Sequence, residues 1–250
     1  METNYFEDYS PSLDRVMPMK VWGHAGRPVL FIPCQDGHFQ DFENFHMTDV
    51  FYGWIESGQC MVFSIDTIDA ETWSNTNGDL AWRMQQHERW IEYITNTAVP
   101  HIREYCNWKN GWDGYPGIMS FGCSMGATHA LNLYLRFPFL FDRCLALSGI
   151  YTASFFVGDY MDEICYRNSI TDYMSNFPQD HPYIEEYNRH KAVVCAGTGA
   201  FEEPWSTEYL GQRFHELGIN IWVDLWGPDV NHDWPWWYKQ AEYFLPYLMS

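Results

Sequence analysis

The segment Gly122-Cys123-Ser124-Met125-Gly126 places a serine at the centre of the pattern Gly-x-Ser-x-Gly. A serine in this pattern can act as a nucleophile, because glycines two positions to either side allow a sharp turn that exposes the hydroxyl. The segment follows the apolar run 117–121 and precedes the helical pattern 125–137, which is the strand-turn-helix setting that such a turn requires. The structural alternative is a glycine-rich turn with a bystander serine. The pattern favours covalent attack by Ser124 on an acyl carbonyl, as in the cleavage of an ester.

Attack by a serine requires a base, and the base most often used is histidine. Five histidines follow the serine: His129, His181, His190, His215 and His232. Of these, two fall within predicted helices and two flank a long irregular segment, so we interpret these four as structural or surface residues. His232 lies between a predicted strand and the last predicted helix, where a loop can carry it to the serine. We therefore predict His232 as the base.

A carboxylate is expected between the serine and the histidine along the chain, to hold the imidazole in the correct tautomer. Glu202 and Glu203 follow the predicted strand 191–197 directly, and either could serve. Asp224 is a weaker candidate because it lies inside a predicted strand. We predict Glu202 and keep Glu203 as the alternative.

The oxygen of an attacked carbonyl becomes negatively charged and needs hydrogen-bond donors, which backbone N–H groups commonly supply. The N–H of Met125 is expected at a helix N-terminus, where the helix dipole favours negative charge. Gly37 in the loop after the strand 29–34 allows close backbone approach, so the N–H of His38 is the second predicted donor. The alternative for this loop is an Asp-Gly turn with no catalytic role.

Short apolar runs alternate with helical patterns along most of the chain, which favours an α/β fold with a mostly parallel sheet and helices on both faces. An antiparallel edge strand is predicted within 12–22. Helices are predicted over 80–105, with a break at Pro100, and over 125–137, 205–217 and 235–249. The buried strands are predicted at Val29–Cys34, Cys60–Asp66, Gly117–Gly122, Arg143–Gly149, Lys191–Gly197 and Asn220–Gly227.

The 250 residues fit a single domain over 1–250, since the sequence contains no repeat, low-complexity tract or linker. One segment, 151–190, interrupts the alternation of strands and helices with about forty residues. Irregular segments of this length are uncommon without a function. We interpret it as a lid or a wall of the substrate pocket, with a pair of ordinary helices as the alternative.

The composition excludes several classes of protein. A formal net charge of −19 disfavours binding to nucleic acid or to anionic membranes. No apolar run is long enough to span a membrane, and the acidic N-terminus does not resemble a signal peptide. Seven cysteines without a C-x-x-C pair indicate buried free thiols, and we expect a cytoplasmic protein. No motif for a metal or another cofactor is found, so none is predicted.

The Gly-x-Ser-x-Gly segment, the Asp36-Gly37-His38 loop and the ending His232-Asp233-Trp234-Pro235-Trp236-Trp237 resemble the "putative esterase" branch of the α/β-hydrolase superfamily. This branch includes S-formylglutathione hydrolase (esterase D), feruloyl and acetyl-xylan esterases, enterochelin esterases and mycolyltransferases. The resemblance extends from about Arg15 to Phe244. A narrower similarity, to uncharacterised bacterial esterase-like proteins, rests on the stretches 23–28 and 69–73.

The resemblance implies Ser124 as nucleophile, His232 as base, and the amides of His38 and Met125 as oxyanion donors. Many relatives carry Asp soon after a Gly-Thr-Gly-like turn, whereas this chain has Ala200 and then Glu202. A Glu occupies the acid position in mycolyltransferases, so the difference is compatible with Glu202.

We therefore expect a serine esterase that acts on a small-molecule ester through an acyl-enzyme. An acyltransferase that uses the same acyl-enzyme is one alternative, and a non-catalytic binding module on this scaffold is the other. The sequence leaves open whether the protein forms a homo-oligomer.

Overall fold

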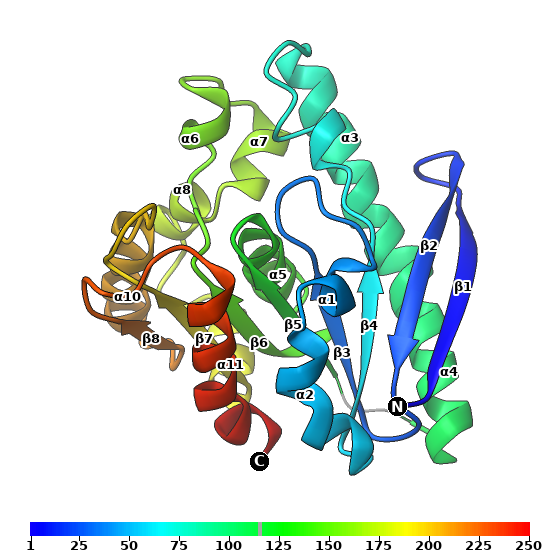
Figure 1. Ribbon diagram of the computed structural model, residues 1–250. Helices are drawn as coiled ribbons and strands as arrows, with labels where there is room; N and C mark the ends of the chain where they lie inside the picture. Colours follow the sequence, from blue (N-terminus) through cyan, green and yellow to red (C-terminus); the bar gives the residue numbers. More distant parts are fainter. Residues whose placement is uncertain (115–116) are drawn as a thin grey trace.

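The computed structural model describes residues 1–114 and 117–250. Within these ranges, eight strands form one sheet in the order β1-β2-β4-β3-β5-β6-β7-β8 (Figure 1). The strands β3, β4, β5, β6, β7 and β8 are parallel to one another, whereas β2 is antiparallel to both β1 and β4. The predicted α/β class with a mostly parallel sheet is therefore confirmed. The strands are β1 (Thr3–Ser10), β2 (Arg15–Trp22), β3 (Arg27–Ile32), β4 (Cys60–Ile65), β5 (Ile118–Cys123), β6 (Phe141–Leu147), β7 (Lys191–Ala196) and β8 (Trp222–Leu225).

The prediction that 12–22 forms the antiparallel edge is wrong in one respect. β2 is antiparallel as expected, but β1 pairs with its outer side over its full length and forms the edge itself. β1 contains acidic residues and is largely exposed, so it lacks the apolar run that indicates a buried strand. Its partner, and not its own composition, makes it a strand.

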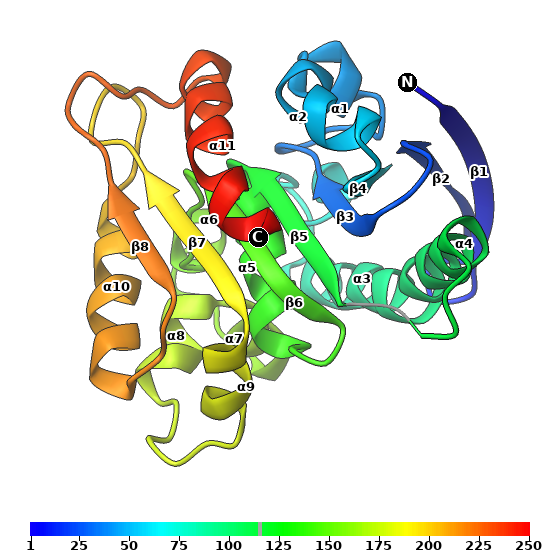
Figure 2. The same cartoon turned by 90° about the horizontal axis from the view of Figure 1, so that it is seen from below.

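Helices cover both faces of the sheet, as predicted (Figure 2). On one face, α1 (Asp41–Asn44), α2 (Met47–Glu56) and α11 (Trp234–Met249) pack on side chains such as Phe31 and Phe121. On the other face, the main helices are α3 (Leu80–Tyr93), α4 (Val99–Asn110), α5 (Met125–Arg136) and α10 (Trp205–Leu217). The sheet therefore has an apolar core on each side, which explains why its central strands read as continuous apolar runs.

The break predicted at Pro100 takes the form of a π-helical turn, Ile94–Ala98, between α3 and α4. Proline has no N–H to donate to the carbonyl four residues earlier, and its ring crowds the preceding turn. Pro100 lies in the first turn of α4, where a missing N–H costs nothing.

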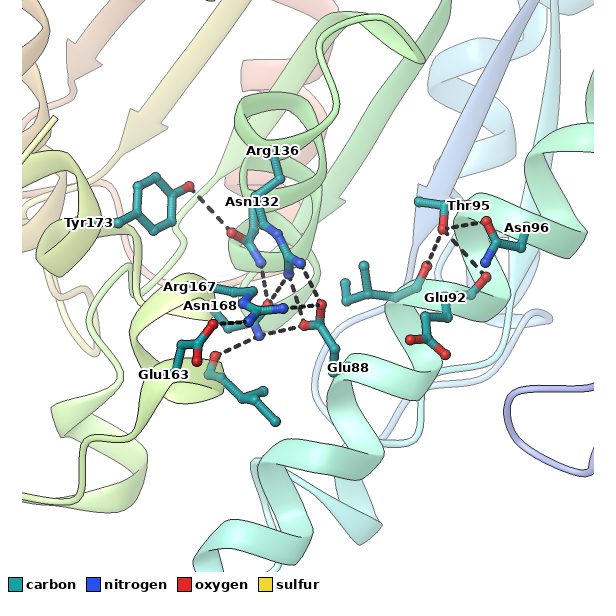
Figure 3. Close-up of polar contacts among 12 residues, drawn as sticks. Glu88, Glu92, Thr95, Asn96, Asn132, Arg136, Glu163, Arg167, Asn168 and Tyr173 are labelled. Carbon is teal, nitrogen blue, oxygen red and sulfur yellow. Dashed lines mark hydrogen bonds and ion pairs between the residues drawn. The ribbon is translucent and has the colours of Figure 1, made fainter. Parts of the chain in front are cut away.

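Residues 151–190, all of them described, form four short helices: α6 (Ser154–Val157), α7 (Glu163–Asn168), α8 (Ile170–Ser175) and α9 (Tyr183–Arg189). A polar cluster joins this segment to the core (Figure 3). Glu88 of α3 pairs with Arg136 of α5 at 2.6 Å and accepts a hydrogen bond from the Asn168 side chain at 2.9 Å. Arg167 lies 3.5 Å from the same carboxylate. The segment is therefore attached through α7 to two long helices.

The Glu88 carboxylate is the centre of this cluster. Burial raises its pKa, but hydrogen bonds from Arg136 and Asn168 and the charges of Arg136 and Arg167 outweigh burial and hold the pKa below its usual value. A carboxyl with a lowered folded-state pKa stabilises the protein above the unfolded-state pKa, and this contribution is lost as the pH falls through the folded-state pKa.

We expect Glu88→Gln to lower the free energy of unfolding at pH 7 by about 1–3 kcal/mol, because it leaves Arg136 partly buried without its counter-charge. The difference from wild type should narrow as the pH falls from 7 towards 3. Urea unfolding followed by tryptophan fluorescence measures both. Glu185→Gln, which removes an exposed partner of Arg189, is the matched control and should cost less than about 0.5 kcal/mol. A loss of stability in Glu88→Gln that is small, or that does not change with pH, would contradict this role of Glu88.

Candidate active site

Ser124 occupies the turn between β5 and α5 with φ of 57° and ψ of −129°. This is a backbone conformation that residues other than glycine rarely adopt, and such strain is typical of functional sites. The N–H of Ser124 donates to the carbonyl of Leu147 at 2.8 Å, which ties the turn to the end of the neighbouring strand β6. The turn therefore presents Ser124 at the carboxyl end of the sheet.

The two glycines of the motif are required by close packing. A Cβ atom at Gly122 would lie 2.3 Å from the carbonyl of Gly126, and one at Gly126 would lie 2.2 Å from the carbonyl oxygen of Ile32. Both distances are far below van der Waals contact. The start of α5 is thus packed against its own strand and against the end of β3.

The structure brings His232 to Ser124. His232 lies in the loop between β8 and α11, and its Nε2 atom is 2.9 Å from Ser124 Oγ. The ring of Trp237 packs edge-on against the imidazole, with 5.0 Å between ring centroids. The imidazole is therefore held on one side by the serine and on another by an aromatic ring.

Glu202 faces the other imidazole nitrogen, with 3.3 Å between His232 Nδ1 and Glu202 Oε2. Its side chain is only 1% exposed. The second oxygen, Oε1, accepts hydrogen bonds from Ser148 Oγ at 2.7 Å and from the N–H of Gly197 at 3.2 Å. A buried carboxylate without donors would be costly, and these contacts satisfy it.

The loops that carry Glu202 and His232 are bonded to each other. The N–H of His232 donates to Ala200 at 3.0 Å, the N–H of Gly199 donates to Val230 at 2.9 Å, and the N–H of Ala200 donates to the Asn231 side chain at 2.7 Å. These contacts fix the distance between the carboxylate and the imidazole.

The other candidates for the acid and the base lie elsewhere. Glu203 accepts from the N–H of Ser206 at 3.4 Å at the start of α10, and Asp224 lies within β8. His129 is buried against Asp69 at 2.9 Å, His190 pairs with Glu186, His181 contacts its own loop, and His215 is exposed on α10.

The two amides predicted as oxyanion donors differ in their surroundings. Met125 is the first residue of α5, where N–H groups have no carbonyl partner within the helix. The N–H of His38 donates to Asp41 Oδ2 at 3.0 Å, and the carbonyl of His38 accepts from the N–H of Asp41 at 2.9 Å. The amide of His38 is therefore engaged by a carboxylate in this structure.

A cysteine precedes the serine, but it is not equipped for attack. Burial raises the pKa of Cys123 well above its ordinary value, and it raises the pKa of the neighbouring Cys34 to about 12. Such thiols stay protonated near neutral pH, whereas the thiolate is the nucleophile. All seven cysteines lie in the described ranges and are free thiols, as predicted.

Sequence reasoning missed two residues of this site, Ser148 and Trp237. Ser148 directly follows β6, and Trp237 lies in the first turn of α11. The predicted strand 143–149 included Ser148, whereas β6 ends at Leu147 and leaves Ser148 at the carboxyl edge of the sheet, where residues that follow parallel strands meet. Trp237 belongs to the segment 232–237 that carries the family resemblance, but no pattern distinguished its role from those of the other tryptophans.

Within residues 1–114 and 117–250, no group of three or more His, Cys, Asp or Glu side chains is placed to hold a metal ion. None of the helices in these ranges is both long and apolar enough to cross a membrane.

The family model described as "Putative esterase" matches residues 10–246. A search of curated proteins finds no match. Among solved structures, a ferulic acid esterase aligns with a TM-score of 0.74 and 16% identity, covering 99% of this chain and 98% of that one. S-formylglutathione hydrolases from Agrobacterium tumefaciens and Staphylococcus aureus align with TM-scores of 0.70 and 0.66 at 14% and 11% identity. These alignments cover 99% and 100% of this chain and 94% and 97% of theirs. The neighbours share the α/β-hydrolase fold with this chain.

We expect Gly126→Ala to lower the free energy of unfolding by more than about 3 kcal/mol or to prevent folding, because the added methyl group meets backbone atoms that cannot move aside. Gly53→Ala is the matched control. Gly53 lies in α2 with open space around its Cβ position, and alanine there should stabilise by up to about 1 kcal/mol. Urea unfolding measures both, and wild-type stability of Gly126→Ala would contradict the packing argument.

Proposed function

The chain belongs to the esterase family, and from this premise we propose that it hydrolyses a carboxylic ester through an acyl-enzyme on Ser124. The family makes it a carboxylic ester hydrolase of the serine type. One observation carries the finer proposal: the unbroken contact from Ser124 Oγ to His232 Nε2 at 2.9 Å, and from His232 Nδ1 to Glu202 Oε2 at 3.3 Å. The substrate is a small-molecule ester.

In the proposed mechanism, His232 Nε2 takes the proton of the Ser124 hydroxyl as the oxygen attacks the ester carbonyl. The tetrahedral intermediate collapses, the bond to the alcohol oxygen breaks, and His232 returns the proton to the leaving alcohol. Water then attacks the acyl-enzyme with His232 again as base, which releases the acid and restores Ser124. Throughout, Glu202 stabilises the imidazolium and keeps Nε2 directed at the reacting atoms.

The N–H groups of Met125 and His38 are the proposed donors to the oxyanion. Met125 is supported by its place at the start of α5, next to the nucleophile. His38 can take this role when the carboxylate of Asp41 shares its N–H with the substrate oxygen or turns away from it. The two proposed donors therefore differ: the N–H of Met125 lies at the start of a helix, whereas the N–H of His38 already donates to Asp41.

We propose the segment 151–190 as a fixed wall of the substrate pocket within a single domain. Ala153, Val157 and Cys165 form an apolar cluster with Met125 and with Trp73 of another loop. The cluster includes Met125, the residue that directly follows the proposed nucleophile Ser124. The attachment of α7 through Glu88 favours a wall over a mobile lid.

We expect Ser124→Ala to lower kcat/KM for p-nitrophenyl acetate by about 10³–10⁶-fold, because the covalent step is lost. Labelling by a fluorophosphonate probe should be lost as well. Ser120→Ala is the matched control: it removes a buried hydroxyl from β5, one that donates to the backbone carbonyls of Ala130 and Arg143. It should keep activity and labelling. Equal rates for Ser124→Ala and wild type would overturn the proposal. If the wild type transfers the acyl group to added alcohols, the protein is an acyltransferase and not a hydrolase.

The two adjacent glutamates provide a sharp test of the acid. We expect Glu202→Gln to lower kcat about 10²–10⁴-fold, because the imidazolium loses its counter-charge and its orientation. Glu203→Gln should change kcat less than about threefold, since the Glu203 side chain accepts a hydrogen bond from the N–H of Ser206 in α10 and none from His232. Steady-state kinetics on both variants decide the assignment. A larger loss for Glu203→Gln would transfer the role to that residue.

A further inference from the structure

Ser148 is held in an unusual conformation beside the proposed acid. It directly follows β6, is 2% exposed and has φ of 58°, in the left-handed region that favours glycine. Its N–H donates to the carbonyl of Cys195 at the end of β7, at 2.7 Å. A residue other than glycine in this region costs of order 1 kcal/mol or more, so the packing around it must compensate. Glycine would relieve the strain, and only the hydroxyl would be lost.

The hydroxyl of Ser148 has two polar partners. Trp237 Nε1 lies 3.0 Å from Ser148 Oγ, and Ser148 Oγ lies 2.7 Å from Glu202 Oε1. An indole N–H can only donate, so the serine oxygen accepts this bond. Its own proton is then left for the carboxylate. The direction of the chain of hydrogen bonds is therefore set by chemistry: from Trp237 to Ser148 to Glu202.

This series of hydrogen bonds gives the two carboxylate oxygens of Glu202 different partners. Oε1 receives the hydrogen bonds of Ser148 and Gly197, so it is anchored to the scaffold. Oε2 is left to face His232 Nδ1. Without the serine, Oε1 would keep only the longer bond of 3.2 Å to Gly197. The carboxylate could then rotate, and its alignment with the imidazole would be lost.

Trp237 contacts His232 directly and is linked to Glu202 through Ser148. Its ring packs edge-on against His232, and its N–H reaches Glu202 through Ser148. A buried indole N–H needs an acceptor, and a backbone carbonyl would suffice, as it does for Trp90 with Asp66. A strained serine between Trp237 and the carboxylate is not needed for that purpose alone.

We propose that Ser148, oriented by Trp237, is a positioning residue that holds Glu202 in line with His232. The inference rests on the proposed function and goes beyond it, since neither residue belongs to the triad. Ser148 acts through Glu202 and does not touch the substrate. Its loss should therefore lower kcat and leave KM unchanged.

The first experiment measures kcat and KM for p-nitrophenyl acetate in Ser148→Ala and Trp237→Phe. We expect kcat to fall about tenfold in Ser148→Ala, by analogy with other residues that orient a catalytic group. Trp237→Phe keeps a ring against His232 and loses only the N–H, so kcat should fall about threefold. KM should stay within twofold in both variants.

Matched controls remove the same groups elsewhere. Ser120→Ala deletes a buried hydroxyl from β5, and Trp90→Phe deletes a buried indole donor on the opposite face of the sheet. Both should retain wild-type kcat. If Ser148→Ala does not fold, Trp237→Phe provides the test by itself.

A double-mutant cycle separates positioning from a general structural role. With Glu202→Ala as background there is no carboxylate to orient, so adding Ser148→Ala should change kcat less than twofold. A tenfold loss in both backgrounds, or wild-type kcat in both Ser148→Ala and Trp237→Phe, would overturn the inference. If Ser124→Ala keeps its activity and its fluorophosphonate labelling, the proposed function fails instead. The two failures are therefore distinguishable.

Discussion

The backbone at Ser124, with φ of 57° and ψ of −129°, lies between two glycines that are packed too closely to carry side chains. Gly122 and Gly126 lie so close to each other and to the end of β3 that a methyl group at either position would meet backbone atoms at 2.2–2.3 Å. This packing ties β5, α5 and β3 together at one point. The direction of the serine hydroxyl, and with it the place of every other residue of the site, depends on this constraint.

The proposed base and acid, His232 and Glu202, are held by hydrogen bonds between their loops. Their loops follow β8 and β7, the last two strands of the sheet, and backbone hydrogen bonds between 197–202 and 227–232 join them into one unit. Loop residues are ordinarily the most mobile part of an α/β fold. Here, mutual hydrogen bonding and a buried carboxylate replace the rigidity that a helix or strand would supply.

Polar groups anchor the region around the site in two places. Glu88 attaches α7 of the segment 151–190 to α3 and α5, and Ser148 attaches the carboxylate of Glu202 to Trp237 of α11. Both carboxylates accept several hydrogen bonds in a largely buried setting, where a half-satisfied charge would be destabilising. Each carboxylate therefore fixes the geometry around it, and its replacement is expected to lower the stability of the protein.

The sequence by itself determined the fold class and located the Gly-x-Ser-x-Gly turn, because apolar periodicity and this motif are local properties of the chain. It also singled out Ser124 and His232, since each lies between a predicted strand and a predicted helix. Local pattern could not reveal β1, whose exposed residues become a strand only by pairing with β2.

Which of Glu202 and Glu203 faces His232 was decided by the tertiary structure, because the two adjacent side chains point in different directions that only the packed loop defines. Tertiary structure alone joined Ser148 and Trp237, 89 residues apart, in one chain of hydrogen bonds. It also revealed that Asp41 engages the amide of His38. Such contacts depend on where separate segments meet, and no spacing along the chain encodes that distance.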